Sequence, residues 1–402
     1  MKSILYITEL LPYPLISGGR IKTLETIKTL SKKYHLHLVC QVGQKEHLKQ
    51  LNNIISKNVS IKCFYNPNIN KDYGDYQLKV LWAFVQGLPL YVYRYKNKTM
   101  KRYIDHFIKK SKPDVIHIDH LNMAQFLPRK KNSPWVYEEH NLEYQLNYLR
   151  FLFAKKIKLK LYLFFESLIS FFYELRQLSR FDYIFAISNV DKKKLQKTFK
   201  LSSPIFTFLP YYPIVSQKKL NKKSESILFI GNLNWEPNED AVTWFCQEIF
   251  PAIKKKNPKA QFHVVGEMNK YLTPSLLKLP GVFFHGFQKN IDPFLEKAAV
   301  FVLPFRIGGG IRIKALTAIA HRIPLVATTL GIEGLQLCQN KNFLLANNAS
   351  PFAKKVIKLI SNKKLRNQIS HSSQKYLLAH HGEKTKESFL ETYNKIIQRS
   401  WK

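Results

Sequence analysis

The sequence has few cysteines for its length. Only four of its 402 residues are cysteines, and they stand far apart at Cys40, Cys63, Cys246 and Cys338. This spacing excludes the CxxC motifs of zinc and redox sites. Isolated cysteines are typical of free thiols in a reducing compartment, so we expect a cytoplasmic protein.

Long hydrophobic runs are also missing. No stretch reaches the roughly 18 uncharged apolar residues that a membrane-spanning helix needs, so we expect none. At the N-terminus, Glu9 and Pro12 interrupt the first apolar run, which is not the pattern of a signal peptide.

Acidic residues are scarce beside the basic ones. The chain has 27 Asp and Glu against 64 Lys and Arg, a formal net charge of +37. The lysines are spread along the whole chain, so part of this excess reflects general composition. The remainder favours anionic partners, either phosphorylated substrates or an anionic membrane face, which for a cytoplasmic protein is the inner face of the plasma membrane. Without zinc-finger spacing, an RNP-type motif or a basic tail, we expect no nucleic-acid partner.

What the chain does contain is an alternation of short apolar strands with amphipathic helices, which predicts parallel sheets covered by helices on both faces. The alternation breaks once, in a proline-rich stretch around residues 202–223, and then begins again. We therefore predict two doubly wound α/β domains, residues 1–212 and 225–386, joined by a linker at 213–224. A last helix at 387–402 is expected to return to the first domain.

In the first half, a glycine turn and two polar strand ends are candidate binding elements. Gly18 and Gly19 follow the first strand and precede a helix, as in turns that bind phosphate. Asp119-His120 and the run from Glu138 to Glu143 follow buried strands, at the sheet edge where ligands bind. The histidines could act on a sugar or phosphate, or could be structural hydrogen-bonding groups; both interpretations stay open.

In the second half, the segment 301–335 contains a strand, three consecutive glycines and then Arg312 and Lys314 before a helical run. Glycines let a backbone approach a ligand closely, and a helix N-terminus attracts anions. The pattern therefore favours a phosphate site, although a flexible loop with two solvated cations would have the same sequence.

The segment from Tyr148 to Ser179 has a long helical pattern rich in Phe, Leu and Tyr, with four lysines near its start. The preferred interpretation is that its aromatic residues pack on the domain core. The alternative is a basic and aromatic surface that lies on an anionic bilayer.

Read in order, the motifs resemble the landmarks of the retaining family 4 glycosyltransferases, of the glycosyl transferases group 1 type. The resemblance covers nearly the whole chain. It rests on SGGRIKTLETIKTLS, IFAISNVDKKKL, SILFIGNLNWEPNEDAVTWFCQEIFPAI, FHVVG, VFFHGF and PFRIGGGIRIKALTAIAHRIPLVATTLGIEGL.

This resemblance implies the GT-B fold, two Rossmann-like domains facing a cleft, and a hexosyl- or glycosyltransferase activity (EC 2.4). A nucleotide-diphosphate sugar is the expected co-substrate, held by the second domain. The expected acceptor is a glycan or lipid-linked molecule held by the first domain, in surface polysaccharide or glycoconjugate biosynthesis. Transfer is expected to retain the anomeric configuration without a metal or other cofactor.

The resemblance also assigns residues to roles. It implies that Arg312, Lys314 and His140 are catalytic, and that His120, Asn141 and Glu143 lie on the acceptor side. The implied donor-binding residues are Gly18, Gly19, Gly231, Asn232, Gly266, Gly309, Gly310, Thr317 and Glu333.

One departure from the family pattern concerns its pair of glutamates seven residues apart. Gly309 and Thr317 occupy the two positions here, and Thr317 replaces the acid that usually binds the nucleotide ribose. A hydroxyl can also bind a ribose, without the added strength of a charged acceptor, and Glu333 could take over this role. The alternative is a catalytically weakened glycosyltransferase-like binding subunit of a polysaccharide assembly complex.

Overall fold

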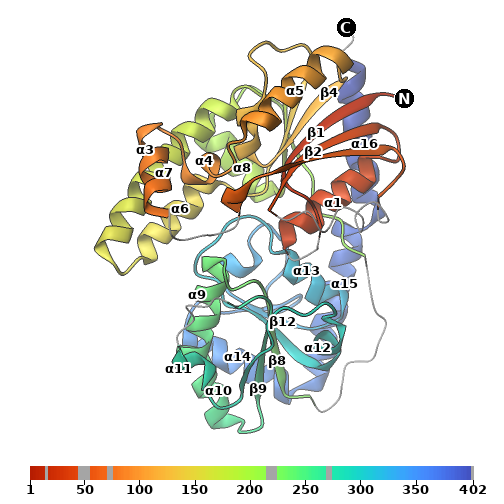
Figure 1. The fold of residues 1–402 in the computed structure, drawn as a ribbon. Helices are drawn as coiled ribbons and strands as arrows, with labels where there is room; N and C mark the ends of the chain where they lie inside the picture. The colour runs from red at the N-terminus through yellow and green to blue at the C-terminus, as the bar shows by residue number, and fades with distance from the viewer. Residues whose placement is uncertain (14–16, 44–54, 70–75, 214–223, 269–273, 400–402) are drawn as a thin grey trace. The chain divides into compact units, whose positions relative to one another are not determined.

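The protein is described from a computed structural model, which describes residues 1–13, 17–43, 55–69, 76–213, 224–268 and 274–399. The chain forms two compact units (Figure 1). The first contains Met1–Pro210 together with Lys384–Lys402, and the second contains Tyr211–Glu383. Most of the predicted linker, residues 214–223, lies outside the described residues.

The first unit is built on a seven-stranded sheet with the order β3-β2-β1-β4-β5-β6-β7, in which all neighbouring strands are parallel. The strands are β1 (Ser3–Leu10), β2 (His35–Val42), β3 (Val59–Tyr65), β4 (Val115–Asp119), β5 (Trp135–Glu138), β6 (Tyr183–Ala186) and β7 (Ile205–Thr207). The helices are α1 (Gly18–Leu30), α3 (Tyr76–Val85), α4 (Leu90–Tyr93), α5 (Lys98–Ser111), α6 (Glu143–Phe153), α7 (Ile157–Leu178), α8 (Asn189–Phe199) and α16 (Glu383–Arg399), with short 3-10 turns at η1 (Pro67–Ile69) and η3 (Leu121–Phe126).

Local sequence explains where several of these helices begin. Ser17, Asn97 and Ser188 are the N-caps of α1, α5 and α8, and each side chain accepts a backbone N–H of the first turn. Such caps satisfy backbone donors that have no partner inside the helix.

The second unit repeats the plan with six strands in the order β10-β9-β8-β11-β12-β13, again all parallel. Its strands are β8 (Ser226–Ile230), β9 (Gln261–Val265), β10 (Val282–Phe284), β11 (Ala298–Leu303), β12 (Leu325–Ala327) and β13 (Leu344–Leu345). Its helices are α9 (Glu236–Trp244), the π-helical turn η4 (Phe245–Ile249), α10 (Phe250–Lys256), α11 (Pro274–Leu277), α12 (Asp292–Lys297), α13 (Ile313–Ala320), the turn η5 (Leu330–Ile332), α14 (Ala349–Ser361) and α15 (Lys363–His381). The predicted fold class, two doubly wound parallel-sheet units, is confirmed.

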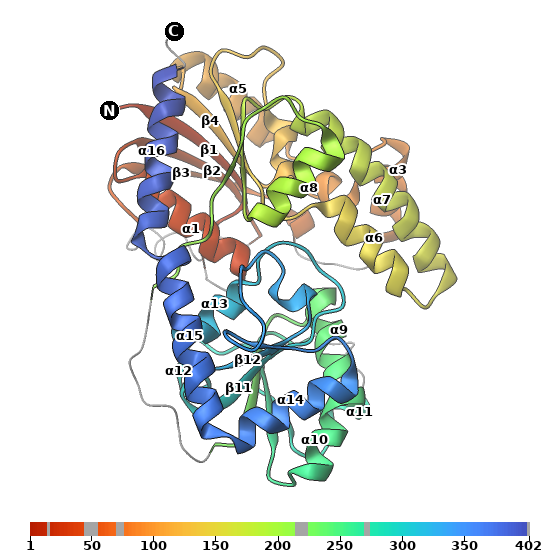
Figure 2. The same ribbon diagram turned by 180° about the vertical axis from the view of Figure 1, so that it is seen from behind.

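Helix α16 lies against the sheet of the first unit, as both views show (Figures 1 and 2). Its Phe389 and Tyr393 belong to the same buried cluster as Tyr6 of β1 and Phe185 of β6. The Phe389 ring stacks on Phe208 with centroids 3.8 Å apart. A segment about 175 residues later in the chain therefore completes the core of the first unit.

The long helix expected over residues 148–179 is instead two helices, α6 and α7, which pack on each other. The break falls at Ala154 and Lys156, whose backbones are extended. Polar groups join the two helices, because Ser167 Oγ donates to the Tyr144 carbonyl at 2.9 Å and Asn147 donates to Ser170 Oγ at 3.2 Å. Among the described residues, no helix is both long and apolar enough to cross a membrane.

Candidate functional site

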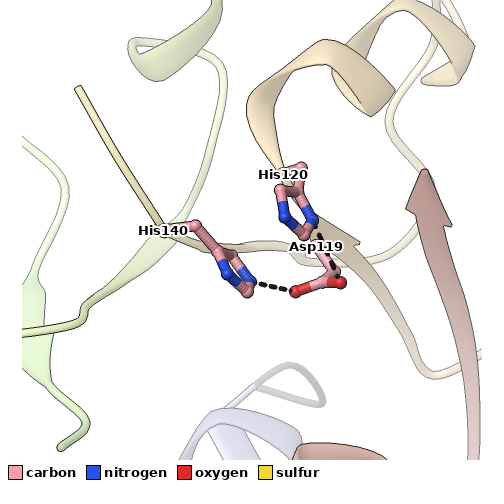
Figure 3. Close-up of side chains that lie close together, drawn as sticks. All are labelled: Asp119, His120 and His140. Atoms are coloured by element: carbon pink, nitrogen blue, oxygen red, sulfur yellow. Dashed lines mark hydrogen bonds and ion pairs between the residues drawn. The ribbon is translucent and has the colours of Figure 1, made fainter. Parts of the chain in front are cut away.

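The C-terminal end of β4 in the first unit carries a buried carboxylate, Asp119, that is the centre of a hydrogen-bond network (Figure 3). His140 Nε2 lies 2.5 Å from Asp119 Oδ1, and His120 Nδ1 lies 3.2 Å from Oδ2. Thr8 of β1 and Thr23 of α1 donate to the same Oδ2 at 2.6 and 2.8 Å. Both carboxylate oxygens are therefore fully used, which offsets the cost of burying the charge.

The two imidazole rings stack on each other with centroids 3.8 Å apart. His120 takes a positive φ of 74°, which is uncommon for a residue other than glycine. Its Nε2 lies 3.9 Å from a carboxylate oxygen of Glu9. Gly19 faces the pair, because a Cβ there would lie 3.7 Å from His120 Nε2 and 3.8 Å from His140 Nδ1. The structure thus brings together the predicted glycine turn and both predicted histidines.

The charges of these groups are unequal. Burial alone would raise the pKa of Asp119, but His140 and His120 lower it well below its ordinary value. Burial lowers the pKa of His140 to about 4, and the nearby charges of His120 and Lys22 add to this effect. Burial also acts to lower the pKa of His120, yet Glu9 and Asp119 raise it to about 9.

At neutral pH, His120 is therefore charged and His140 is neutral. The neutral imidazole keeps its proton on Nε2, where it donates to Asp119, so Nδ1 is its acceptor nitrogen. An imidazole held in one tautomer can accept a hydrogen bond from a hydroxyl group, as a sugar offers.

Two further residues on the predicted acceptor side lie close by in the chain. Asn141 is half-buried, and Glu143 is the first residue of α6. Burial raises the pKa of Glu143 to about 7, with the charge of Glu9 acting in the same direction. Glu143 is thus a carboxyl group that changes charge near neutral pH.

The sequence interpretation missed a second buried network beside this one. Lys22 of α1 forms an ion pair with Glu138 at 3.2 Å and donates to the Glu139 carbonyl at 2.7 Å. Glu138 also binds His117 at 3.1 Å. The available signal was Lys22 next to Thr23 on the helix face that also carries Leu24 and Ile27, since a lysine there must be buried with a partner.

In the second unit, Lys314 lies in the first turn of α13 and points at the end of β8. Its ammonium donates to Asn238 Oδ1 at 2.7 Å and lies over the Phe229 ring, 4.6 Å from the centroid. A Cβ on Gly231 would approach Lys314 Nζ to 2.6 Å, so the glycine provides room for the lysine. Burial lowers the pKa of Lys314 well below its ordinary value, and Arg312 adds to this effect. Among the described residues, no carboxylate forms an ion pair with Lys314.

Arg312 is the N-cap residue of α13 and is buried, with 4% of its surface exposed. Its guanidinium donates to the carbonyls of Gly309 and Gly310, and it lies over the Phe305 ring, 4.9 Å from the centroid. A Cβ on Gly308 would come within 2.3 Å of this group. The glycine loop therefore wraps around the arginine.

Two more predicted donor-binding residues lie at the adjacent strand ends. Asn232 follows β8, and its side chain donates to Glu267 at 2.6 Å. Gly266 follows β9 with a φ of 144°, and a Cβ there would lie 2.1 Å from the Gly231 carbonyl oxygen. Only glycine permits this close approach of the two strand ends.

Thr317 and Glu333 occupy different surroundings. Thr317 is buried on α13, where its hydroxyl accepts a hydrogen bond from Tyr212 at 2.9 Å and donates to the Ile313 carbonyl at 3.2 Å. Glu333 follows the turn η5 and is half-buried. The Thr317 hydroxyl would have to exchange these bonds to bind a ribose.

Asp119, His120 and His140 could hold a metal ion, because their ligand atoms lie within 4.8 Å of one another. One carboxylate and two imidazoles are a donor set that suits zinc. An ion there would have to replace the hydrogen bonds of the carboxylate described above. The expectation of a metal-independent protein stays a prediction.

The comparisons with known proteins agree with this arrangement. Residues 224–362, the part that contains Lys314 and its loop, match the family model described as glycosyl transferases group 1. The chain is 22% identical over 377 residues to an uncharacterized 44.6 kDa protein in the cps region of Klebsiella pneumoniae, covering 90% of this chain and 92% of that one.

Solved structures match over nearly the whole chain. Sucrose-phosphate synthase from Thermosynechococcus elongatus matches with a TM-score of 0.73 and 14% identity, covering 100% of both chains. TarM of S. aureus, in complex with fondaparinux, α-GlcNAc-glycerol and UDP, gives a TM-score of 0.71 at 12% identity, with 99% of this chain and 100% of that chain covered. HepE of Anabaena, in complex with UDP-glucose, gives 0.67 at 13% identity, covering 98% and 100%.

The fold and the matched segment together define the class of protein: a transferase (EC 2.4), a glycosyltransferase of the GT-B type. More particularly, its C-terminal unit carries the segment of the glycosyl transferases group 1 model. The predicted fold and enzyme class are confirmed at this level.

Proposed function

We propose that this chain is a retaining, family 4 type glycosyltransferase that moves a sugar from a nucleotide-diphosphate sugar to a glycan or lipid-linked acceptor in surface polysaccharide biosynthesis. The relative from a cps region supports this setting, and the UDP and UDP-glucose complexes of the structural neighbours support the donor class. We further propose that it acts in the cytoplasm and contacts an anionic membrane face peripherally.

The observation that carries the proposal is the surroundings of Lys314. A buried ammonium held by an amide oxygen, with Arg312 as a second cation nearby, is electrostatically incomplete. A donor diphosphate would supply the missing negative charge and keep Lys314 protonated. The N-terminus of α13 adds backbone N–H groups of the kind that bind phosphate.

In this mechanism the second unit stabilises the charge that develops on the leaving diphosphate, through Lys314 and Arg312. The leaving phosphate accepts the proton of the acceptor hydroxyl, so no pair of protein carboxylates is required. The two cations take the part that a metal ion has in other transferases. In the first unit, His140 is proposed to accept a hydrogen bond from an acceptor hydroxyl and to position it.

Substitution of Lys314 tests the proposal. With a panel of UDP, GDP and ADP sugars, we expect the wild type to transfer or slowly hydrolyse one donor. Lys314→Ala should lower kcat/KM by roughly 100- to 1000-fold, because it removes a charge that acts on the leaving group. The matched control is Lys363→Ala, an exposed lysine of the same unit, which should leave the rate unchanged. No turnover and no melting-temperature shift of the wild type with any donor would refute the proposal.

The hydrogen bonds of Thr317 favour a second candidate, a catalytically weakened binding subunit. Its hydroxyl is already engaged by Tyr212, and the charged acceptor of the usual family pattern is missing. Thr317→Glu, combined with Tyr212→Phe to make room, distinguishes the candidates. A large gain in nucleotide affinity without turnover would support the weakened subunit, whereas unchanged affinity would count against it.

A further inference from the structure

Helix α7 is amphipathic in the opposite sense to an ordinary surface helix. Its buried positions are mainly polar and include Glu166, Ser167, Ser170, Glu174 and Gln177. Beyond its first turn, its exposed positions are large and apolar except for Arg176: Leu161, Phe164, Phe165, Leu168, Phe172 and Leu175. Phe164 and Phe165 are adjacent, and every other step in this exposed set is three or four residues, which places it on a single stripe of the helix.

The polar contacts of the inner side fix this orientation. Glu166 accepts the Leu90 N–H at 2.7 Å, and Glu174 accepts the Tyr144 N–H at 3.0 Å. Asn147 of α6 donates to Ser170 at 3.2 Å. A rotation of α7 that buried the aromatic stripe would break all of these hydrogen bonds and leave their partners unsatisfied. The polar side of α7 therefore stays inside, and the apolar side faces outward.

The apolar surface continues onto the neighbouring helices. On α3, Leu81, Trp82 and Phe84 are exposed, and the Phe84 ring meets Phe165 of α7 edge-on with centroids 6.2 Å apart. At the end of α6, Phe153 is 44% exposed. Figures 1 and 2 show α3, α6 and α7 side by side at one end of the first unit. We call the exposed apolar side chains of α3, α6 and α7 the apolar face.

This corrects the preferred interpretation of the sequence, in which the aromatic residues of this segment pack on the core. Phe172 is 63% exposed, although its neighbour Phe171 packs against the core cluster. A contiguous apolar surface of this kind marks an interaction site rather than ordinary surface variation.

The exposed charge where α6 meets α7, at one end of the apolar face, has one sign. Lys155, Lys156 and Lys158, at the turn between α6 and α7, are exposed, and Lys160 lies over the Phe151 ring at 5.3 Å. The acidic residues of residues 143–178 are Glu143, Glu166 and Glu174, of which the last two are buried. The turn therefore presents lysines without an exposed carboxylate beside them.

We propose that the apolar face is a docking surface for an anionic lipid bilayer, with its aromatic and aliphatic side chains inserted at the interface and the lysines of the α6–α7 turn bound to lipid phosphates. Large apolar side chains bordered by lysines are the composition of interfacial membrane-binding helices. A second copy of the chain is a poorer occupant, because pairing two such faces would bring two clusters of lysines together.

This inference extends the peripheral contact of the proposed function by naming its surface and its lipid chemistry. The chain also connects this surface to the candidate acceptor site, since α6 begins three residues after His140. The test below measures binding alone, so its failure leaves the proposed transfer reaction unaffected.

The experiment is co-sedimentation of the full chain with vesicles at about 0.15 M salt, where the Debye length is about 8 Å. One set of vesicles contains phosphatidylcholine alone and the other also contains phosphatidylglycerol. We expect binding to the anionic vesicles that falls as salt is raised, and weak binding to the neutral ones. Equal binding to both, or binding to neither, would overturn the proposal.

Matched variants locate the contact. Lys155→Gln, Lys156→Gln and Lys158→Gln together should weaken partitioning by on the order of 100-fold. The control triple, Lys363→Gln, Lys364→Gln and Lys375→Gln, makes the same change in net charge on α15 and should bind like the wild type. If both triples lose binding equally, overall charge rather than this surface is responsible and the proposal fails.

The apolar part is tested with Phe165→Ser and Phe172→Ser, two exposed positions whose change should leave the fold intact. This pair should lower binding at least about tenfold, whereas Phe283→Ser and Phe287→Ser, exposed aromatics of the second unit, should not. Brominated lipid should quench the fluorescence of the wild type but not that of Trp82→Phe. If Phe165→Ser and Phe172→Ser instead dissolve a dimer and leave vesicle binding unchanged, the face is a self-interface and the proposal is wrong.

Discussion

At the scale of residues, the pairing of Asp119 with two stacked histidines links the stability of the first unit to pH. Burial acts to lower the pKa of His120, but Glu9 and Asp119 raise this pKa to about 9. A histidine whose pKa is raised by folding contributes stability that is fully present below its unfolded pKa of about 6.5. That contribution is lost as pH rises through the folded value.

We therefore predict that the wild type loses up to about 3 kcal/mol of unfolding free energy between pH 6.5 and pH 9 through this one group. His120→Gln should lack most of this loss, because the variant has no proton to give up. Denaturant titrations at pH 6.5 and pH 9 measure the difference. His106→Gln, an exposed histidine of α5, is the control and should keep the wild-type dependence. An equal loss of unfolding free energy between pH 6.5 and pH 9 in the wild type and in His120→Gln would contradict the prediction.

The sequence predicted some of this network and not the rest. Asp119, His120 and His140 follow buried strands, and the carboxyl ends of parallel strands share one edge of a sheet, so their meeting could be expected. Thr8 and Thr23 bind Asp119 across sequence separations of 111 and 96 residues. No local pattern distinguishes such a threonine from any other, because the partner is set by strand register.

At the scale of elements, α7 shows why a helical pattern does not reveal which side is buried. The many aromatic residues of this segment favoured the prediction that they are buried in the core. In the structure, polar contacts of α7 with α4 and α6 occupy the inner side, and most of the aromatic residues lie outside. The same contacts bury Glu166, and this burial raises its pKa to about 7. A carboxyl group whose pKa is raised by folding costs stability once pH exceeds its unfolded pKa of about 4.3. The full cost is reached above its pKa in the folded protein.

Glu166→Gln should therefore stabilise the protein at pH 8 by up to about 3 kcal/mol and bring no gain at pH 4.5. The glutamine still offers an oxygen to the Leu90 N–H, so only the buried charge is removed. Denaturant unfolding at the two pH values measures this. The exposed Glu387→Gln is the control, for which no change is expected. A variant that is less stable than the wild type at pH 8 would show that the carboxylate is preferred at this position.

At the scale of the whole molecule, the first unit is discontinuous in sequence, because Lys384–Lys402 belongs to it. We predict that residues 1–210 alone do not form a stable fold. Without α16, Phe185, Phe208 and Tyr6 would lose the contacts of Phe389 and Tyr393, and loss of even one buried Phe costs about 3–5 kcal/mol. Addition of a peptide that spans 383–402 should restore a cooperative melting transition in circular dichroism.

The matched peptide carries Phe389→Ser and Tyr393→Ser and should restore nothing, because it lacks the two buried rings. A cooperative transition of 1–210 by itself would contradict the prediction.

The fold of the two units could be predicted from strand and helix alternation, which is a local signal. The return of the last helix to the first unit was predicted from the helical pattern at the end of the chain. Its partners on β1 and β6 could not be, because they lie far away in the sequence.

The late arrival of α16 has a consequence for how the chain is made. A ribosome completes residues 1–210 well before residues 384–399, and the intervening segment takes on the order of ten seconds or more at 5–20 residues per second. During that interval the sheet face that holds Tyr6 and Phe185 lacks the part of its cover that α16 provides. Synthesis and folding of the first unit are thus separated in time, and we expect chaperones that recognise exposed aromatic surface to bind the nascent chain in this interval.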